Sequence, residues 1–204
     1  MTPQQEPQSQ HRHFSRSAPL NDLEYYLSGP ITSPEDYVEW FHEIRNAGPS
    51  DTVRIYINSP GGVVDTAIQF MRVLGETEAE VTCSIEGSCM SAATMVFLCA
   101  DAFEITPHSL FMVHNYSGGM FGKGAELYDQ AVFERKWSTN FMHEVYKNFL
   151  TPEEIDIVLN NKDLWMTSDE VLERCTRLMK ARMDETNAEL QAGTEDEQAM
   201  DAMG

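Results

Sequence analysis

Positive charge is scarce in this chain. Of 204 residues only 14 are Lys or Arg, against 33 Asp or Glu, which gives a formal net charge of −19. Nucleic acids and anionic membrane surfaces are bound by clustered cations, so we expect neither as a partner. The chain also lacks an apolar run long enough to cross a bilayer, and its first 20 residues contain no apolar stretch like that of a signal peptide. These absences predict a soluble, cytoplasmic protein.

Cysteine is sparse as well, and its spacing is uninformative. The four cysteines show no C-x-x-C pattern and lie mostly inside apolar runs, at Cys83, Cys89, Cys99 and Cys175. In such runs cysteine behaves as a small hydrophobic residue. We therefore expect a reducing compartment, and we expect neither a metal nor an organic cofactor.

A single folded domain is expected in the middle of the chain. A length of 204 residues allows one buried core with loose ends. Residues 1–21 are polar, proline-containing and aperiodic, which predicts a flexible arm. Residues 184–204 are acidic and contain no aromatic side chain, which predicts a disordered, solvated tail. The folded domain is then 22–183.

Strand-like and helix-like runs alternate through this domain. The runs with strand character are 24–28, 52–58, 81–85 and 110–114. Those with helical spacing are 33–46, 64–76, 91–100 and 124–149. Repeated strand, helix, strand units predict an α/β fold with a mainly parallel sheet covered by helices. In such sheets functional groups gather at the carboxyl ends of the strands.

Two polar residues lie at such strand ends. Ser91 follows the small-residue stretch from Gly87 and opens an apolar, buried helix, whose N-terminus would favour negative charge on an attacked carbonyl. His114 closes the apolar run from Leu110. Taken alone, Ser91 is more readily interpreted as a helix N-cap, and His114 as a hydrogen-bonded structural residue. Together they indicate a nucleophile and its general base.

Glycines flank this pair in the sequence. If the turn Ser59-Pro60-Gly61-Gly62 lies beside Ser91, the N–H groups of Gly62 and Ala92 form an oxyanion hole. Gly118 and Gly119 follow His114 in an extended segment that would add a peptide substrate as a strand, or else is a loose connection. We expect Gly61, Gly118 and Gly119 to contact the substrate.

In this order the motifs resemble those of ClpP, the proteolytic subunit family of the Clp protease, within the ClpP/crotonase superfamily. The I-N-S-P-G-G run at 57–62, the G-x-x-x-S turn ending at Ser91, the P-H-S-L-F-M-V-H run ending at His114 and the glycines at 118–122 are each similar to a family motif. The resemblance implies a spiral core of β-β-α units and a protruding handle, made by the strand after His114 and the helix that follows. It also implies self-assembly into stacked rings.

The same resemblance implies a serine endopeptidase. Its substrate would be a peptide or an unfolded protein, and its partner an AAA+ unfoldase, while the peptidase step itself is ATP-independent. Ser91 would be the nucleophile, His114 the base, and Gly62 and Ala92 the oxyanion donors. Ala92 stands where the family usually has methionine, and the Ser91–His114 spacing is shorter than in typical bacterial members. The run Ser91-Ala92-Ala93-Thr94 resembles bacteriophage variants, which adds phage structural proteins as candidate substrates.

The third member of a triad is also implied by resemblance. The run D-L-W-M-T-S at 163–168 is similar to the family's D-x-F-[ML]-S, which implies Asp163 as the acid. Asn160 and Asn161 remain as alternatives, although asparagine cannot stabilise an imidazolium by charge. Thr94 would be the nucleophile in another alignment, but Gly87 fixes the register in favour of Ser91.

Two other functions stay open. A crotonase-type enzyme acting on acyl-coenzyme A shares the core and the oxyanion hole, but it usually works through carboxylates, so the Ser91 and His114 pair counts against it. An inactive ClpP-like ring subunit, with a structural or inhibitory role, is compatible with the same residues. Residue identity does not establish the geometry of a triad.

Overall fold

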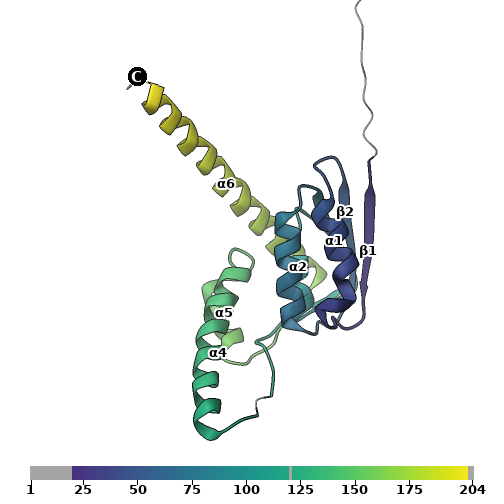
Figure 1. Ribbon diagram of the computed structural model, residues 1–204, viewed down its shortest axis with the longest axis vertical. Coiled ribbons are helices and arrows are strands. Elements are labelled where there is room, and N and C mark those ends of the chain that lie inside the picture. The colour runs from purple at the N-terminus through teal and green to yellow at the C-terminus, as the bar shows by residue number, and fades with distance from the viewer. Residues whose placement is uncertain (1–19, 120, 202–204) are drawn as a thin grey trace, which may run out of the picture.

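The computed structural model describes residues 20–119 and 121–201. The strands are β1 (Asp22–Ser28), β2 (Thr52–Ser59), β3 (Glu80–Met90), β4 (Ala102–Ile105), β5 (Leu110–Val113) and β6 (Leu164–Thr167). The helices are the 3-10 turn η1 (Pro34–Tyr37), α1 (Val38–Asn46), α2 (Val64–Glu76), α3 (Ala92–Phe97), α4 (Gly124–Val145), α5 (Pro152–Leu159) and α6 (Ser168–Asp201). In Figure 1, α1 and α2 lie with β1 and β2, whereas α4 and α5 stand to one side and α6 projects from the body.

The strands form one sheet in the order β1-β2-β3-β5-β6, and β4 also pairs with β3. The pairings are parallel except for that of β5 with β6, so the predicted α/β fold with a mainly parallel sheet is confirmed. Strand β3 has two partners on one side: its first half pairs with β4 and its last three residues pair with β5. A register shift against β2 separates the two halves. Such an irregularity bends a strand, and here the end of β3 arrives beside β5.

The periodic spacing of apolar residues in the sequence explains how β2, α1 and α2 form and pack together. In β2 the side chains of Val53, Ile55 and Ile57 are fully buried while their neighbours are not, as expected for a half-buried strand. Helix α2 begins and ends where its helical spacing predicts, and it buries Phe70. The Phe70 ring contacts that of Phe41 on α1, with 4.8 Å between the ring centroids. Aromatic edge-to-face contacts of this kind hold α1 and α2 together on the sheet.

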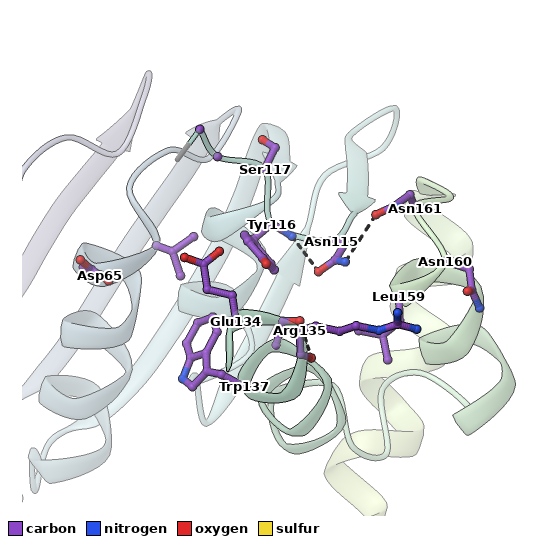
Figure 2. Close-up of a pocket in the computed structure, with 14 residues that line it drawn as sticks. Asp65, Asn115, Tyr116, Ser117, Glu134, Arg135, Trp137, Leu159, Asn160 and Asn161 are labelled. Carbon is purple, nitrogen blue, oxygen red and sulfur yellow. Dashed lines mark hydrogen bonds between the residues drawn. The ribbon is translucent and has the colours of Figure 1, made fainter. Parts of the chain in front are cut away.

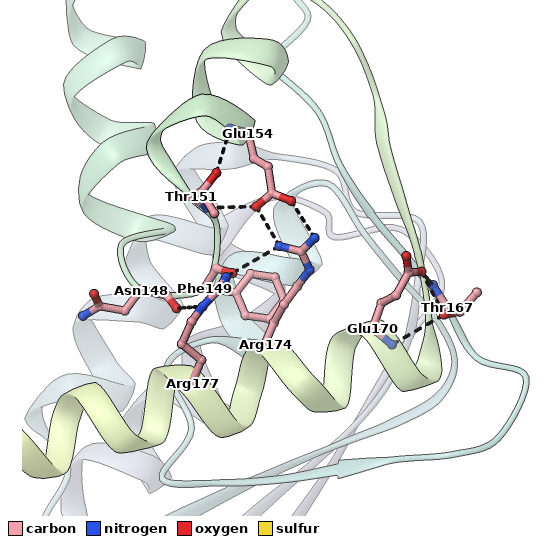
Figure 3. Close-up of polar contacts among 8 residues, drawn as sticks. All are labelled: Asn148, Phe149, Thr151, Glu154, Thr167, Glu170, Arg174 and Arg177. Carbon is pink, nitrogen blue, oxygen red and sulfur yellow. Dashed lines mark hydrogen bonds and ion pairs between the residues drawn. The ribbon is translucent and has the colours of Figure 1, made fainter.

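An ion pair fastens α5 to α6 (Figure 3). Two nitrogens of the Arg174 guanidinium donate to the two Glu154 carboxylate oxygens, at 2.7 and 2.6 Å. The same carboxylate accepts from the N–H of Thr151, and the Thr151 hydroxyl accepts from the N–H of Glu154, which is a capping box at the start of α5. The position of α5 in turn sets the connection from α5 to β6, which carries Asp163.

The handle differs from the expectation. The helix α4 is present and stands with α5 to one side of the body in Figure 1, but residues 114–119 form no strand. A strand needs a hydrogen-bonded neighbour, and among the described residues this segment has none. Helix α3 is also shorter than predicted, ending at Phe97, and Arg182 donates to the carbonyls of Leu98 and Ala100 just beyond it.

The predicted disordered tail at 184–204 is wrong as far as Asp201. Helix α6 continues through this segment, because its Ala, Glu, Gln and Leu residues are strong helix formers, even though residues 184–192 are exposed. The Glu185 carboxylate also accepts from the Lys147 ammonium at 2.8 Å. Of the predicted arm, residues 1–19 lie outside the described residues, as do 202–204 of the tail. No helix in the described ranges is both long and apolar enough to span a membrane.

Candidate active site

Ser91 occupies the sharp turn between β3 and α3. Its backbone has φ 54° and ψ −128°, a conformation that residues with a Cβ rarely adopt. The turn is held in place because the Ser91 N–H donates to the carbonyl of Met112 in β5, at 2.8 Å. Strain of this kind persists where the surrounding structure enforces it, and it is concentrated at functional sites.

His114 follows β5 directly and meets this serine. Its Nε2 lies 2.6 Å from the Ser91 hydroxyl oxygen, and both side chains are half-buried. In the tautomer with the proton on Nδ1, the Ser91 hydroxyl donates to Nε2, which is the arrangement a general base requires. The parallel pairing of Met90 with Met112 explains the approach, because it brings the ends of β3 and β5 side by side.

Gly61 packs against the serine turn so closely that no other residue fits. A Cβ on Gly61 would lie 2.5 Å from the Met90 carbonyl oxygen, 2.6 Å from the Ser91 Cβ and 2.9 Å from the Ala92 nitrogen. Its φ of +89° is also a glycine conformation. The neighbouring Gly62 is pressed against Ile31 in the same way. The structure therefore places the Pro-Gly-Gly turn beside Ser91.

Two backbone donors at this junction are unused. Among the described residues, neither the N–H of Gly62 nor that of Ala92 has a hydrogen-bond acceptor. Ala92 is the first residue of α3, so its N–H is one of the groups that a helix leaves unpaired. These are the two donors that the sequence predicted for an oxyanion hole.

The position of Asp163 follows from the pairing of β5 with β6. This pairing is antiparallel and ends with Val113 opposite Leu164, so the same register continued by one residue beyond the strands would set His114 opposite Asp163. Directly opposite residues of antiparallel strands bring their Cβ atoms to about 4.5–5.5 Å. The Asp163 side chain is exposed, and within the described ranges no hydrogen bond joins its carboxylate to His114.

The alternatives to Asp163 are engaged elsewhere. The Asn160 amide donates to the Asp156 carbonyl within its own helix, at 2.8 Å. The Asn161 side-chain oxygen accepts from the Asn115 amide at 3.5 Å, as Figure 2 shows. Of these three residues, Asp163 alone therefore has a side chain without a protein partner among the described residues.

Thr94, the alternative nucleophile, is inaccessible. Its side chain is fully buried in α3. Its hydroxyl donates to the Ser91 carbonyl oxygen at 2.6 Å and lies 2.6 Å from the Tyr146 hydroxyl. No substrate carbonyl reaches an oxygen in that position, so the geometry favours Ser91.

A cleft of about 890 Å³ adjoins the Ser91 and His114 pair (Figure 2). One wall is the irregular segment after His114, including the exposed Gly118 and Gly119, and the opposite wall is α4 with Trp137. A second, much smaller recess of about 30 Å³ opens at Ser91 itself and is lined mainly by apolar side chains, among them Met95 and Phe141.

Sequence reasoning missed Asn58 as part of this site. Its side-chain oxygen accepts from the Ser88 N–H at 3.1 Å, on the stretch of β3 where the register shifts. A Cβ on Gly87 would lie 2.8 Å from that oxygen. The signal was the asparagine inside the I-N-S-P-G-G run, a polar residue at the end of an apolar strand.

This arrangement is typical of serine hydrolases. It consists of a strained serine at a strand-to-helix turn, a histidine that contacts the serine hydroxyl, and two unused N–H groups beside them. Comparison with known proteins specifies the family. A family model described as Clp protease matches residues 30–202. The chain therefore belongs to the Clp protease family.

Individual relatives agree with this assignment. The "ATP-dependent Clp protease proteolytic subunit 1" of Protochlamydia amoebophila (strain UWE25) is 33% identical over 144 residues, which is 66% of this chain and 66% of that protein. The protein of the same name from Chlamydia caviae is 28% identical over 159 residues, covering 74% of this chain and 82% of its own length. The solved structure of a ClpP1 point mutant from Listeria monocytogenes has a TM-score of 0.61 at 18% identity, covering 74% of this chain and 86% of that one, and so shares the fold.

Proposed function

We propose that this chain is the peptidase subunit of a compartmental serine protease, with Ser91 as nucleophile, His114 as general base and Asp163 as the acid that orients the histidine. The contact of 2.6 Å between the Ser91 hydroxyl and His114 Nε2 carries the proposal. A serine that is only an N-cap has no need of a histidine on its hydroxyl, and α3 shows no side-chain cap from Ser91.

The chemistry follows from these positions. His114 takes the hydroxyl proton as the Ser91 oxygen attacks the substrate carbonyl, and the carbonyl oxygen becomes an anion. The N–H groups of Gly62 and Ala92 hold that anion. His114 then gives its proton to the leaving amine, and water, activated by the same histidine, hydrolyses the acyl-enzyme. Asp163 stabilises the imidazolium that forms in both halves of the reaction.

The substrate proposed is an extended peptide or an unfolded protein. Its backbone lies along Gly118 and Gly119, whose exposed backbone forms one wall of the cleft and has no strand neighbour among the described residues. Gly61 contributes indirectly, because its lack of a side chain allows the Pro-Gly-Gly turn to pack closely against Ser91. No ATP enters this step.

Stacked rings are proposed because α4 exposes apolar side chains that a monomer leaves in water. The larger of these are Tyr128, Val132, Phe133 and Trp137. Contiguous apolar surface of this kind marks an interaction site. The relatives are named as subunits of an ATP-dependent protease, which supports delivery of substrate by an AAA+ unfoldase. The proposed location is the cytoplasm, and phage structural proteins are a further substrate class suggested by the sequence motif at Ser91.

Fluorophosphonate labelling tests the catalytic proposal. The native, assembled protein should be labelled, and Ser91→Ala should abolish the label. Ser117→Ala is the matched control, because Ser117 is an exposed serine in the adjoining cleft and its loss should leave labelling intact. If assembled protein takes up no label, or if Ser91→Ala is labelled like the wild type, the peptidase proposal is wrong and the inactive ring subunit is favoured.

Native mass spectrometry tests the rings separately. The expected species is a large multiple of the 23.1 kDa chain. Val132→Glu places a charge among the apolar side chains of α4 and should shift the population toward smaller species. A wild-type protein that stays at 23.1 kDa at every concentration would contradict the assembly.

A further inference from the structure

A buried hydrogen-bond chain connects the end of α4 to the nucleophile turn. The Tyr146 hydroxyl lies 2.6 Å from the Thr94 hydroxyl, although the two residues are 52 positions apart. The Thr94 hydroxyl in turn donates to the carbonyl oxygen of Ser91 at 2.6 Å. Thr94 is fully buried and Tyr146 is 2% exposed, so water does not compete for either bond.

The chemistry of the three groups determines which of them donates in each of these hydrogen bonds. A carbonyl oxygen only accepts, so the single hydroxyl proton of Thr94 is used on Ser91. The Tyr146 hydroxyl must then donate to the Thr94 oxygen. Donation requires a protonated phenol, and burial raises the pKa of Tyr146 well above its usual value. The chain therefore runs in one direction, from Tyr146 through Thr94 to Ser91.

This series of hydrogen bonds ends at the peptide group that carries a proposed oxyanion donor. The Ser91 carbonyl and the Ala92 N–H belong to one planar, trans peptide unit, so they point in opposite directions. The Ser91 carbonyl is held twice, by the Thr94 hydroxyl and by the Thr94 N–H at 2.9 Å. Fixing that oxygen fixes the direction in which the Ala92 N–H is presented to a substrate.

Tyr146 is itself held firmly at the other end. It follows the last residue of α4, where its N–H donates to the Met142 carbonyl, and its own carbonyl accepts from the N–H groups of Phe149 and Leu150. Its ring lines the small recess at Ser91 together with Met142. The tyrosine therefore joins α4, the helix with exposed apolar side chains, to the serine turn.

We propose that Tyr146 and Thr94 are positioning residues that aim the Ala92 N–H into the oxyanion hole and couple its direction to the placement of α4. This inference rests on the proposed peptidase function. It assigns a role to two hydroxyl groups that touch neither the substrate nor the reacting atoms. Movement of α4, as on assembly, is transmitted to the oxyanion hole through one buried tyrosine hydroxyl.

Three variants separate this role from simple packing. Tyr146→Phe removes one hydroxyl, Thr94→Val removes the hydroxyl that contacts Ser91 while keeping the volume, and Thr94→Ser restores that hydroxyl. Hydrolysis of a fluorogenic peptide by the full-length, assembled protein gives kcat and KM for each. Tyr26→Phe and Thr139→Val are the matched controls, since Tyr26 is exposed on β1 and the Thr139 hydroxyl donates to the Arg135 carbonyl within α4.

The expected effect falls on kcat. Loss of one oxyanion donor lowers kcat by about 100- to 1000-fold, so a misdirected donor should lose part of that, about 10-fold in Tyr146→Phe and about 100-fold in Thr94→Val. KM should change little, because the carbonyl is still neutral when the substrate binds. Thr94→Ser should recover most of the loss, and the two control variants should match the wild type.

Several outcomes would overturn the inference. Unchanged kcat in both Tyr146→Phe and Thr94→Val would do so, as would loss of thermal stability or assembly with kcat per intact assembly preserved. The fluorophosphonate label separates this failure from that of the proposed function. If the wild type is labelled at Ser91 and the variants keep full kcat, only the positioning role falls. If the wild type is not labelled, both proposals fall together.

Discussion

Two glycines with the same backbone angle provide a test of the site. Gly29 and Gly61 both have φ +89°, but a Cβ on Gly29 would meet nothing within 4 Å, whereas one on Gly61 would meet the Met90 carbonyl, the Ser91 Cβ and the Ala92 nitrogen, all at less than 3.0 Å. Gly29→Ala therefore costs the left-handed strain alone, about 1–2 kcal/mol. Gly61→Ala costs that strain plus the displacement of packed backbone, about 1–3 kcal/mol more.

The two variants should differ in melting temperature, and they should differ by a larger factor in the rate of fluorophosphonate labelling. At about 2–4 °C of Tm per kcal/mol for a chain of this size, Gly29→Ala should melt about 2–8 °C below the wild type and Gly61→Ala about 4–20 °C below. Fluorophosphonate labelling should stay near normal in Gly29→Ala. It should fall about 100-fold in Gly61→Ala, because a shift of about 1 Å at a reacting atom has that effect. Equal melting temperatures and equal labelling rates in the two variants would refute the placement of Gly61 against the nucleophile turn.

Three further predictions concern stability and thiol chemistry. The Arg174 guanidinium lowers the pKa of Glu154, so this carboxylate stabilises the fold above its unfolded pKa of about 4.3 and loses that contribution as the pH falls through the lower folded value. Glu154→Gln should therefore lower Tm at neutral pH and flatten its decline in acid. Phe70→Ala should cost about 3–5 kcal/mol in denaturant unfolding. Burial raises the pKa of Cys83 and Cys89, so iodoacetamide should modify both only after unfolding.

Many of the elements in the first half of the fold could be predicted from the sequence, because apolar periodicity and element ends agree there. In β2 every second residue is apolar, and α2 has both helical spacing and clear ends, so the two elements form where their patterns place them. Strand β4 was not predicted. Its four residues are only partly buried or exposed, and they pair with β3 alone. A strand so short has too few positions to show alternation.

The acidic composition of the C-terminal segment led to the prediction of disorder where the structure has a helix. Acidic residues without aromatic partners indicate disorder when a segment must bury a core, but a helix that continues from an anchored one does not need its own nucleus. The first half of α6 is anchored by buried Val171, Cys175 and Leu178, and the helix then extends into solvent by propagation. The identity of Ser91 and His114 as a pair was accessible from motif order, whereas the contact between Tyr146 and Thr94 had no sequence signal.

The approach of Ser91 to His114 depends on an irregularity that no periodic pattern encodes. Strand β3 must pair with β4 along its first half and with β5 at its end, and the register shift against β2 is what allows one strand to do both. Gly87 lies in that shift because the Asn58 side chain fills the space where a Cβ would be. A larger residue there would displace Asn58, release the Ser88 N–H and let the end of β3 straighten. Ser91 would then move away from the Met112 carbonyl that anchors it, and His114 would lose the hydroxyl it contacts.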